Sequence, residues 1–382
     1  MPCLNEAETL ATCIRKAHNA LSELVLPYEI VIADNGSTDG SQEIARAAGA
    51  RVVDVTEKGY GCALRGGITA AQGDWIIVGD ADDSYDFGSI APFVEKLQEG
   101  FDLVMGCRLP SGNGKIMKGA MPWKHRWIGN PVLTFLGRLF FKSSARDFHC
   151  GLRAFSRSGF ERMNLSTTGM EFASEMVIKA AFAKMRVAEV PITLHKDGRS
   201  RPPHLRSWRD GWRHLRFMLL HCPMWLFCVP GMTLLATGLI FGARLIAGPL
   251  VIGAIGFDTN TLLVCAMSVI MGVQSISFGI FARLFSAQRG LLPPSRRLNT
   301  FLGAVNLERG LLAGCALIIS GLALLVLSLV QWKQTEFGEM SYPDSLRNVI
   351  PAITLIVVGG QLVFSSFFLS VLGLGSPRSS SR

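Results

Sequence analysis

The sequence lacks closely spaced cysteine pairs and has few acidic residues in its second half. Its nine cysteines are scattered without a Cys-x-x-Cys motif, which excludes a thioredoxin-type redox centre and the common zinc patterns. We therefore expect them to act as small buried apolar side chains. Of the 29 acids, 24 lie within residues 1–222, so the two parts of the chain differ in chemistry.

The acid-poor part consists mainly of long apolar runs. Four of them, residues 225–246, 262–285, 311–332 and 349–374, reach the roughly 20 apolar residues that a membrane-spanning helix needs. Their length argues against the alternative, core helices of a soluble protein. This pattern predicts an all-α transmembrane domain of four helices over residues 223–375.

Charges in the loops predict the orientation of these helices. The loop between the second and third runs is basic and has one acid, Glu308. Its arginines are Arg283, Arg289, Arg296, Arg297 and Arg309. By the positive-inside rule this loop is cytoplasmic. Four crossings of a bacterial-type inner or plasma membrane then place residues 1–222 and the C-terminus in the cytoplasm as well.

The net charge of +9 does not indicate nucleic-acid binding. Much of the basic excess lies beside the apolar runs, where anionic lipid or phosphate is the simpler partner. The chain shows no cleavable signal peptide, so the first apolar helix is expected to direct insertion.

The first part of the chain alternates apolar runs with turns and helical patterns. Residues 28–33 form an apolar run that leads through a turn cluster into a helix over 41–48. The same unit recurs in the expected strands 51–55, 75–78 and 102–106 and the expected helices 62–71 and 93–98. This alternation predicts an α/β domain with a mainly parallel, doubly wound sheet. Ligands of such sheets bind at the carboxyl ends of the strands, which here carry Asp34, Asp39, Asp80, Asp82 and Arg108.

The first residues, Met1 to Glu6, are typical of the exit from a strand. We expect the apolar body of that strand ahead of Met1, and a helix from residues 5–8 to about Ala20.

The acidic cluster Asp80-Ala81-Asp82-Asp83 directly follows an apolar run. Carboxylates this close repel one another unless a cation lies among them. A hard divalent ion held by one or two protein oxygens keeps positions open for phosphate oxygens. The cluster therefore indicates a metal and diphosphate site, with a plain acidic loop or a helix cap over residues 87–90 as the alternative.

Four motifs in order carry a family resemblance. They are Pro-Cys-Leu-Asn-Glu at 2–6, Asp-Asn-Gly-Ser-Thr-Asp at 34–39, Asp-Ala-Asp at 80–82 and Asp-Phe-His-Cys-Gly-Leu-Arg at 147–153. Together they resemble family 2 glycosyltransferases of the GT-A fold, and among these the polyprenyl-phosphate sugar synthases of the dolichyl-phosphate mannose or glucose type. The resemblance covers about the first 200 residues and implies a Rossmann-like GT-A domain over residues 1–204.

The resemblance implies roles for individual residues on the donor side. The expected nucleotide-sugar site comprises Pro2, Asn5, Glu6, Asp34, Asp39 and Asp80, with Arg199 and Arg201 from a basic loop that closes over the diphosphate. Asp82 is the expected principal ligand of Mg²⁺ or Mn²⁺, together with Asp80. Ser84 stands where the mannose synthases have a metal-assisting Gln, and Asp83 is an alternative ligand. Asp39 has a second interpretation, as a turn residue bonded to its own backbone.

On the acceptor side, Arg108 and Arg153 are the expected ligands of the acceptor phosphate, because a guanidinium fork matches phosphate oxygens. Asp147, Arg153 and Asp82 form the expected catalytic set. His149 is expected to be structural. Glu171 and Glu175 lie four apart on one helical face and are either site residues or surface acids, and we expect Glu175 to be a surface acid.

Residues 205–222 predict an amphipathic helix between the two domains. Trp208, Trp212, Leu215 and Leu219 form one apolar stripe on a basic background. Such a helix lies in the headgroup plane of a membrane. Packing on the catalytic domain is the alternative.

Together these features predict an inverting enzyme that moves one hexose from UDP-glucose or GDP-mannose to a polyprenyl phosphate. A processive polysaccharide synthase is an alternative, but its Gln-x-x-Arg-Trp signature is missing, and the nearest match, residues 124–127, has no Gln. A non-catalytic scaffold or lipid carrier is a further alternative, against which the intact acids argue. The sugar, the base, the length of the lipid, a role in flipping and the oligomeric state, a homo-oligomer included, stay open at this stage.

Overall fold

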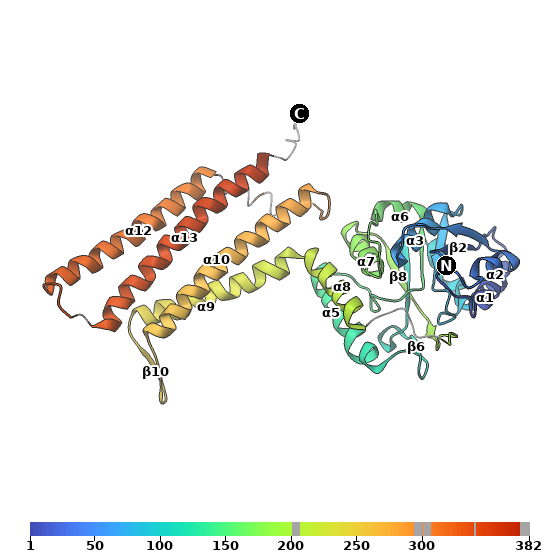
Figure 1. The fold of residues 1–382 in the computed structure, drawn as a ribbon, viewed down its shortest axis with the longest axis horizontal. Helices are drawn as coiled ribbons and strands as arrows, with labels where there is room; N and C mark the ends of the chain where they lie inside the picture. The colour runs from blue at the N-terminus through green and yellow to red at the C-terminus, as the bar shows by residue number, and fades with distance from the viewer. Residues whose placement is uncertain (201–206, 294–299, 301–306, 340, 375–382) are drawn as a thin grey trace. The chain divides into compact units, whose positions relative to one another are not determined.

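The computed structural model describes residues 1–382 except 201–206, 294–299, 301–306, 340 and 375–382. The chain divides into two compact units, Met1–Met218 and Leu219–Arg382. The first mixes strands and helices, and the second is built mainly from long helices (Figure 1). Arg201, Arg296 and Arg297 of the sequence predictions lie outside the described residues.

Two sheets form the centre of the first unit. The strands β1 (Pro2–Cys3), β2 (Val31–Asp34) and β3 (Arg51–Asp54) are parallel. The second sheet has the order β4 (Trp75–Val78), β7 (Arg153–Ser156), β5 (Leu103–Cys107) and β8 (Val187–Pro191), and a short parallel pair joins β6 (Lys115–Ile116) to β9 (Thr193–Leu194). The α/β class is confirmed. β7 runs antiparallel to β4 and β5, however, because the chain turns back after a long excursion that follows β5.

Helices cover the sheets and position the strand ends. They are α1 (Leu10–Glu23), α2 (Ser41–Ala47), α3 (Tyr60–Ala70), α4 (Ala91–Gln98), α5 (Asn130–Phe141), α6 (Arg157–Met163) and α7 (Phe172–Phe182). The buried residues of α1 include Leu10, Cys13, Ile14 and Ala17, a 3–4 spacing that turns one face to the core. The helix expected from residues 5–8 to about Ala20 is present, but it begins later, at Leu10, after a turn in which the N–H groups of Thr9 and Leu10 donate to the carbonyl of Glu6. Asn5 itself has a φ of 59°, outside the right-handed helical region.

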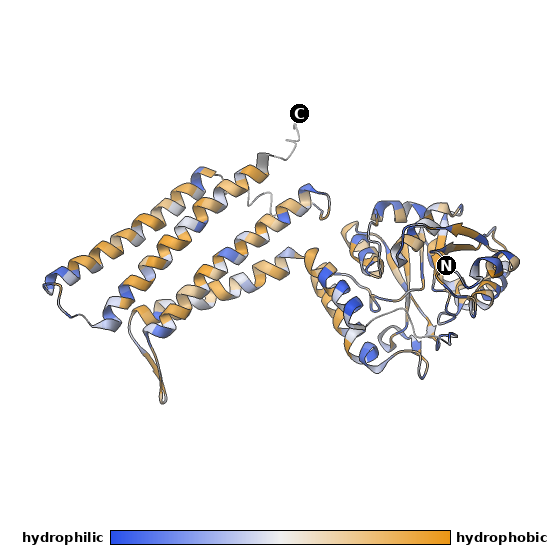
Figure 2. Ribbon diagram, in the orientation of Figure 1, coloured by the Kyte–Doolittle hydropathy of each residue, from blue (hydrophilic) through white to orange (hydrophobic). Residues whose placement is uncertain are grey.

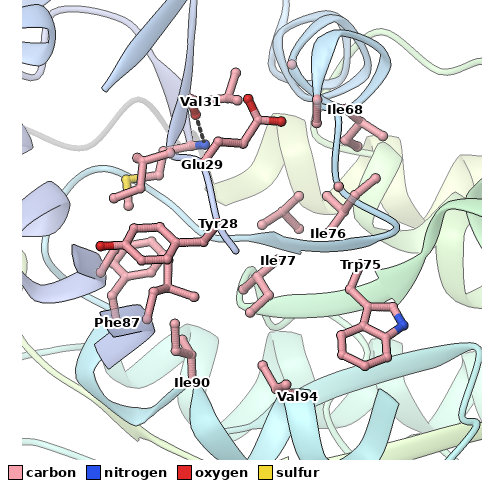
Figure 3. Close-up of a pocket in the computed structure, with 18 of the residues that line it drawn as sticks. Tyr28, Glu29, Val31, Ile68, Trp75, Ile76, Ile77, Phe87, Ile90 and Val94 are labelled. Carbon is pink, nitrogen blue, oxygen red and sulfur yellow. Dashed lines mark hydrogen bonds between the residues drawn. The ribbon is translucent and has the colours of Figure 1, made fainter. Parts of the chain in front are cut away.

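An apolar cavity of about 190 Å³ lies between β2 and β4, and Figure 3 shows the side chains around it. Its lining includes Val31 from β2, Ile77 from β4, Ile68 from α3 and Val94 from α4. Among the described strands, β4 pairs only with β7 and so turns its other edge away from that partner. The cavity is therefore lined by residues of two strands and of the helices that cover them. The strand body expected ahead of Met1 stays a prediction.

Helix α8 (Ser207–Leu220) occupies the predicted amphipathic segment and belongs to the first unit as far as Met218. Asp210, His214 and Met218, each four residues from the next, are buried. Trp208 and Trp212 are 87% and 59% exposed. The helix therefore packs on the first unit with one face and leaves its tryptophans outside.

The second unit contains α9 (Val229–Ile246), a hairpin of β10 (Leu250–Ile252) and β11 (Ile255–Phe257), α10 (Thr259–Gln288), α12 (Leu307–Gln334) and α13 (Tyr342–Leu374). Four helical segments, Met224–Ile246, Thr259–Gln288, Leu307–Gln334 and Tyr342–Leu372, are long and apolar enough to cross a membrane. At most 28% of each apolar stretch is buried, so most of this surface faces outward (Figure 2). The four predicted segments are confirmed.

Small residues allow these helices to approach closely. A Cβ on Gly314 would lie 2.8 Å from the carbonyl oxygen of Gly359, and one on Gly359 would lie 2.6 Å from that of Gly314. Close contact through glycine is a common way to join helices in lipid, where apolar burial alone provides little drive.

All nine cysteines are free and eight are buried, as expected.

Candidate active site

Asp80 and Asp82 lie at the carboxyl end of β4 in different surroundings. The phenol of Tyr60 donates a hydrogen bond of 2.8 Å to Oδ1 of Asp80. Burial, together with the nearby charge of Asp82, raises the pKa of Asp80 to about 6. Oδ1 of Asp82 accepts hydrogen bonds from the backbone N–H of Ser84, at 3.1 Å, and from its hydroxyl, at 2.6 Å. The two carboxylates are thus held close together at a cost that a cation would relieve.

The third acid of the cluster points elsewhere. Asp83 has a φ of 59°, and its Oδ1 accepts a hydrogen bond of 2.8 Å from Nζ of Lys16 on α1. This geometry does not favour Asp83 as the alternative metal ligand. Ser84 remains beside Asp82 and orients its carboxylate.

Arg199 connects three acids around this end of the sheet. Its Nη2 donates to Oδ2 of Asp82 at 2.8 Å and to Oδ2 of Asp197 at 3.2 Å, and its Nη1 donates to Oε1 of Glu6 at 3.1 Å. Its side chain is only 9% exposed. Arg199, the predicted diphosphate ligand, therefore forms an ion pair with Asp82, the predicted metal ligand. Its positive charge compensates the surrounding carboxylates.

Asp34 ends β2 and is 1% exposed. Its Oδ2 accepts hydrogen bonds from the backbone N–H groups of Gly36 and Ser37, each 3.0 Å, and from Nε2 of Gln42, 2.8 Å. Burial raises its pKa, but hydrogen bonds from Ser37, Gln42 and Gly36 outweigh that effect and keep the pKa below its ordinary value. Oδ1 is buried and has no hydrogen-bond partner among the described residues, so this carboxylate keeps one oxygen for a ligand.

Other predicted donor-side residues surround the ends of β1 and β2. Pro2 pairs with Ala33 in the parallel sheet. Oδ1 of Asn5 accepts a hydrogen bond of 2.8 Å from the backbone N–H of Thr38. Asp39 accepts from the backbone N–H of Ala7, at 3.0 Å, and from the N–H and hydroxyl of Ser41, at 3.1 and 2.6 Å. These contacts match the interpretation of Asp39 as a turn residue that joins two loops.

Arg108 and Asp147 form a buried bidentate pair. Nε of Arg108 donates to Oδ2 of Asp147 and its Nη2 donates to Oδ1, both at 2.7 Å, and the backbone N–H of Arg108 adds a bond of 3.0 Å. The side chains are 8% and 0% exposed. Burial raises the pKa of Asp147, but the Arg108 guanidinium outweighs it and keeps that pKa below its ordinary value. The pair stays charged and fixes the start of the 147–153 motif.

Arg153 has a different environment from the one predicted. It is 2% exposed, and Nε, Nη1 and Nη2 donate to the carbonyl oxygens of Cys150, Ala173 and Phe148 at 2.7, 2.6 and 2.9 Å. Its guanidinium is thus engaged by backbone carbonyls, and it holds the 148–150 loop against the segment that begins α7. The geometry favours a positioning role over direct contact with a phosphate.

Two residues that the sequence reasoning missed, Tyr85 and Gly151, connect the halves of the site. The phenol oxygen of Tyr85 accepts hydrogen bonds from Nη1 of Arg108, at 3.2 Å, and from the backbone N–H of Gly151, at 2.8 Å. A Cβ on Gly151 would lie 2.7 Å from Oδ2 of Asp80, so only glycine lets this loop approach the acid. Tyr85 and Gly151 therefore bring the Arg108–Asp147 pair next to Asp80. The only sequence signal was a tyrosine and a glycine within acid-containing motifs.

The remaining predicted positions lie beside the 147–153 motif. His149 is half-buried. Its Nε2 lies 3.2 Å from the hydroxyl of Ser174, and that hydroxyl lies 2.8 Å from Nδ1 of His214 on α8. Glu171 precedes α7 and is half-buried.

The expectation that Glu175 is a surface acid is wrong. Its side chain is 1% exposed. It accepts hydrogen bonds from the backbone N–H groups of Ser166 and Thr167 and forms an ion pair of 2.8 Å with Lys179. The loop at Ser166 and Thr167 covers this carboxylate and donates to it, which a helical spacing does not reveal.

The donor set around Asp82 fits a hard divalent cation. Asp80, Asp82 and Ser84 offer only oxygen atoms, the ligands that Mg²⁺ and Mn²⁺ prefer. Within the part of the chain that the structure describes, no group of three or more His, Cys, Asp or Glu side chains is arranged to hold a metal. Protein oxygens from one or two acids, completed by phosphate, would match this arrangement.

Comparisons with known proteins identify the family of this chain. Residues 1–163 match glycosyl transferase family 2, and residues 280–373 match the glycosyltransferase family 2 C-terminal transmembrane region. The low-salt glycan biosynthesis hexosyltransferase of Haloferax volcanii is 36% identical over 375 residues, which cover 98% of this chain and 88% of that protein. A dolichyl-phosphate hexose transferase of the same organism is 31% identical over 165 residues, 43% of this chain and 68% of that protein.

Among solved structures, glucosyl-3-phosphoglycerate synthase from Mycobacterium tuberculosis, determined with Mn²⁺, uridine diphosphate and glucosyl-3-phosphoglycerate, is similar over 58% of this chain and 77% of that one, with 24% identity and a TM-score of 0.45. The family assignment rests on the sequence matches, which extend over nearly the whole chain. The chain therefore belongs to glycosyltransferase family 2 and is a glycosyltransferase with the C-terminal transmembrane region of that family.

Proposed function

We propose that this enzyme transfers a single hexose from a nucleotide sugar to a polyprenyl phosphate, with inversion at the anomeric carbon. The observation that carries the proposal is the junction at Tyr85 and Gly151. It brings an oxygen-rich donor site, Asp80 and Asp82, next to the buried Arg108–Asp147 pair, in a chain with four apolar helices. The similarity to a dolichyl-phosphate hexose transferase supports the same acceptor class.

On the donor side, Asp34 is the proposed ligand of the nucleoside, because its buried Oδ1 has no partner among the described residues while Oδ2 is held in place. Pro2, Asn5, Glu6 and Asp39 shape the rim of that pocket in this proposal. UDP-glucose and GDP-mannose are the donor candidates.

Asp82 and Asp80, with Ser84 beside them, would hold Mg²⁺ or Mn²⁺. The bound cation supplies charge neutralisation at the diphosphate leaving group. Arg199 adds a guanidinium next to the same oxygens, and its release from Asp82 would make it available to phosphate.

On the acceptor side, the nucleophile needs little activation. A lipid phosphate is already anionic at neutral pH, so its attack requires alignment and charge compensation more than a strong base. In the proposal, Asp147 keeps the Arg108 guanidinium at the edge of the site, and Arg108 compensates the acceptor phosphate. Arg153 acts through the loop that it holds. Direct displacement on an α-linked donor gives a β-linked product.

The proposed orientation has the first unit and the C-terminus in the cytoplasm. It is supported by the arginines of the loop between the second and third helices, against the single acid Glu308. Cytoplasmic nucleotide sugars would then reach the donor side directly.

The test is a transfer assay on membranes that contain the full chain. Membranes receive a panel of labelled nucleotide sugars with polyprenyl phosphate, and the lipid is extracted. We expect one labelled sugar in a mild-acid-labile lipid with a β linkage, and no product when polyprenol replaces its phosphate. Label in a polymer, or in a water-soluble product alone, would contradict the proposal.

A further inference from the structure

Two imidazole rings from different parts of the first unit meet at one buried hydroxyl. The hydroxyl belongs to Ser174 on α7, which is 0% exposed. It lies 3.2 Å from Nε2 of His149 in the 147–153 motif and 2.8 Å from Nδ1 of His214 on α8. The two rings also touch, with centroids 4.6 Å apart. We call this arrangement the hydroxyl bridge, and no step of the proposed transfer uses it.

The single proton of the hydroxyl ties the two rings to one another. Burial lowers the pKa of His214 to about 4, against the opposite effects of Glu171 and Asp210, and it also lowers the pKa of His149. Both rings are therefore neutral at pH 7, and each has one donor and one acceptor nitrogen. Because the hydroxyl of Ser174 donates to one ring and accepts from the other, the state of one ring determines that of the other.

The bond lengths give the bridge a direction. A serine hydroxyl turns about its own side chain until a partner fixes it, and the shorter of its two bonds, 2.8 Å against 3.2 Å, is the one to His214. His214 is buried on the inner face of α8. It therefore fixes the hydroxyl of Ser174, which in turn fixes the ring of His149.

The same turn of α7 holds the backbone on both sides of His149. The carbonyl of Ala173, the residue before Ser174, accepts a hydrogen bond of 2.6 Å from Nη1 of Arg153. The other nitrogens of Arg153 donate to the carbonyls of residues 148 and 150. Residues 148–150 are thus held at every position, two through their carbonyls and the middle one through its ring. Asp147 directly precedes this segment.

We propose that His214 is a positioning residue for the acceptor side of the site. Through Ser174 it fixes the ring of His149, and thereby the place of Asp147 and of the Arg108 guanidinium bonded to it. The inference deepens the proposed function, on which its kinetic part rests. An attack that depends on alignment is sensitive to small displacements of the groups that hold the acceptor.

The kinetic test compares two replacements of His214. His214→Leu fills the space without a donor or acceptor, whereas His214→Asn retains both kinds of group. We expect His214→Leu to raise the KM for polyprenyl phosphate about tenfold, the size of one lost buried hydrogen bond, and to leave the KM for the nucleotide sugar unchanged. His214→Asn should recover most of this loss. Equal impairment by Leu and Asn would overturn the proposal.

Met218→Ala is the matched control. Met218 is 0% exposed and lies one turn further along the same face of α8, so its truncation loosens the helix without removing a bond to Ser174. We expect the KM for polyprenyl phosphate to stay near that of the parent. A rise as large as that of His214→Leu would show that packing of α8, and not the hydroxyl bridge, accounts for the effect.

A double-mutant cycle tests the route through Ser174. Ser174→Ala removes one oxygen atom, a smaller change than His214→Leu, and should raise the same KM by a similar factor. The double variant S174A/H214L should be no worse than either single variant, because all three interrupt one bridge. Rises that multiply in the double variant would refute an action of His214 through Ser174.

Hydrogen exchange tests the positioning without any activity. In the full chain in detergent, the backbone N–H groups of Phe148 and Gly151 donate to the hydroxyls of Thr134 and Tyr85, so their exchange reports how firmly the motif is held. We expect faster exchange of the 147–153 peptide in His214→Leu and parent-like exchange in His214→Asn. Unchanged exchange in His214→Leu would overturn the proposal. Absence of lipid product from the parent would instead refute the proposed function, and the exchange result would still decide the positioning.

Discussion

The donor and acceptor sides of the site differ in how completely their charges are paired within the protein. On the donor side, Asp34 keeps a buried oxygen without a partner among the described residues, and Asp82 is paired with Arg199, which comes from a loop more than 100 residues further along the chain. On the acceptor side, Asp147 accepts three hydrogen bonds from Arg108 alone, and all three guanidinium nitrogens of Arg153 donate to carbonyls.

The two sides of the site are therefore preorganised to different degrees before the substrates bind. The acceptor side is rigid before any ligand arrives, because breaking its buried pair leaves an uncompensated charge. The donor side keeps an unpartnered oxygen on Asp34 and pairs Asp82 with Arg199, whose guanidinium a ligand phosphate could accept instead. Substitutions should therefore reduce turnover on the donor side and folding stability on the acceptor side.

The largest effect is expected from Asp82→Asn. Loss of this charge should lower transfer about a thousandfold, since electrostatic stabilisation of a leaving group accounts for effects of that size. Rates with labelled donor measure the effect, and membrane insertion should be unchanged. Asp83→Asn is the matched control, because Asp83 pairs with Lys16 and tolerates Asn at its positive φ. Normal turnover by the Asp82 variant would refute its assignment.

Asp147→Asn should act mainly on stability. It leaves the buried Arg108 without its counter-charge, which costs about 3–5 kcal/mol in the free energy of unfolding. Thermal unfolding of the detergent-solubilised enzyme measures this loss. A variant as stable as the parent would show that the buried Arg108–Asp147 ion pair does not stabilise the fold as described.

The same pair predicts a pH dependence. Because Arg108 lowers the folded-state pKa of Asp147, the pair stabilises the protein fully above the unfolded-state pKa of about 4, and this stabilisation is lost as pH falls through the lower folded value. The difference in stability between parent and Asp147→Asn should therefore shrink below about pH 4.

Arg153→Ala should lower stability less, by about 2–3 kcal/mol, because three buried carbonyls lose their donor. Acceptor use should suffer more than donor binding, since the displaced 148–150 loop directly follows Asp147. The KM values for the two substrates, measured below the melting temperature, test this. Unchanged stability with a selective loss of acceptor binding would instead favour direct phosphate contact.

The smallest effect concerns the cavity between β2 and β4. An apolar five-residue extension joined to Met1 should fill it as a strand and stabilise the unit by about 1 kcal/mol after ordering costs. An extension of the same length made of Gly and Ser is the control. Equal melting temperatures for the two would show that the cavity does not accept an added strand.

Strand ends and membrane segments were predictable because their signals are local. An apolar run followed by acids located Asp34, Asp80 and Asp82 correctly, and uninterrupted apolar length located the four spans. The antiparallel β7 was not predictable, because nothing local marks the direction in which a strand enters a sheet.

The partners of individual side chains were harder to predict. The sequence of the 147–153 motif indicates an arginine near the site but not that three carbonyls converge on it. Tyr60 and Tyr85 reach Asp80 and Arg108 from other elements, and Glu175 is covered by a loop. Such contacts depend on the tertiary arrangement, which spacing along the chain does not encode.

The ion pairs of Arg199 have a consequence for the order of binding. A bare cation that approaches Asp82 must compete with the guanidinium of Arg199, which already neutralises this carboxylate. The displaced arginine would then lose its ion pair with Asp82 and gain no other in return. A nucleotide diphosphate brings its own negative charge, so it accepts the arginine as it delivers the cation. Cation affinity should therefore be weak alone and strong with nucleotide present, which makes the resting enzyme insensitive to the free cation concentration and responsive to its sugar donor.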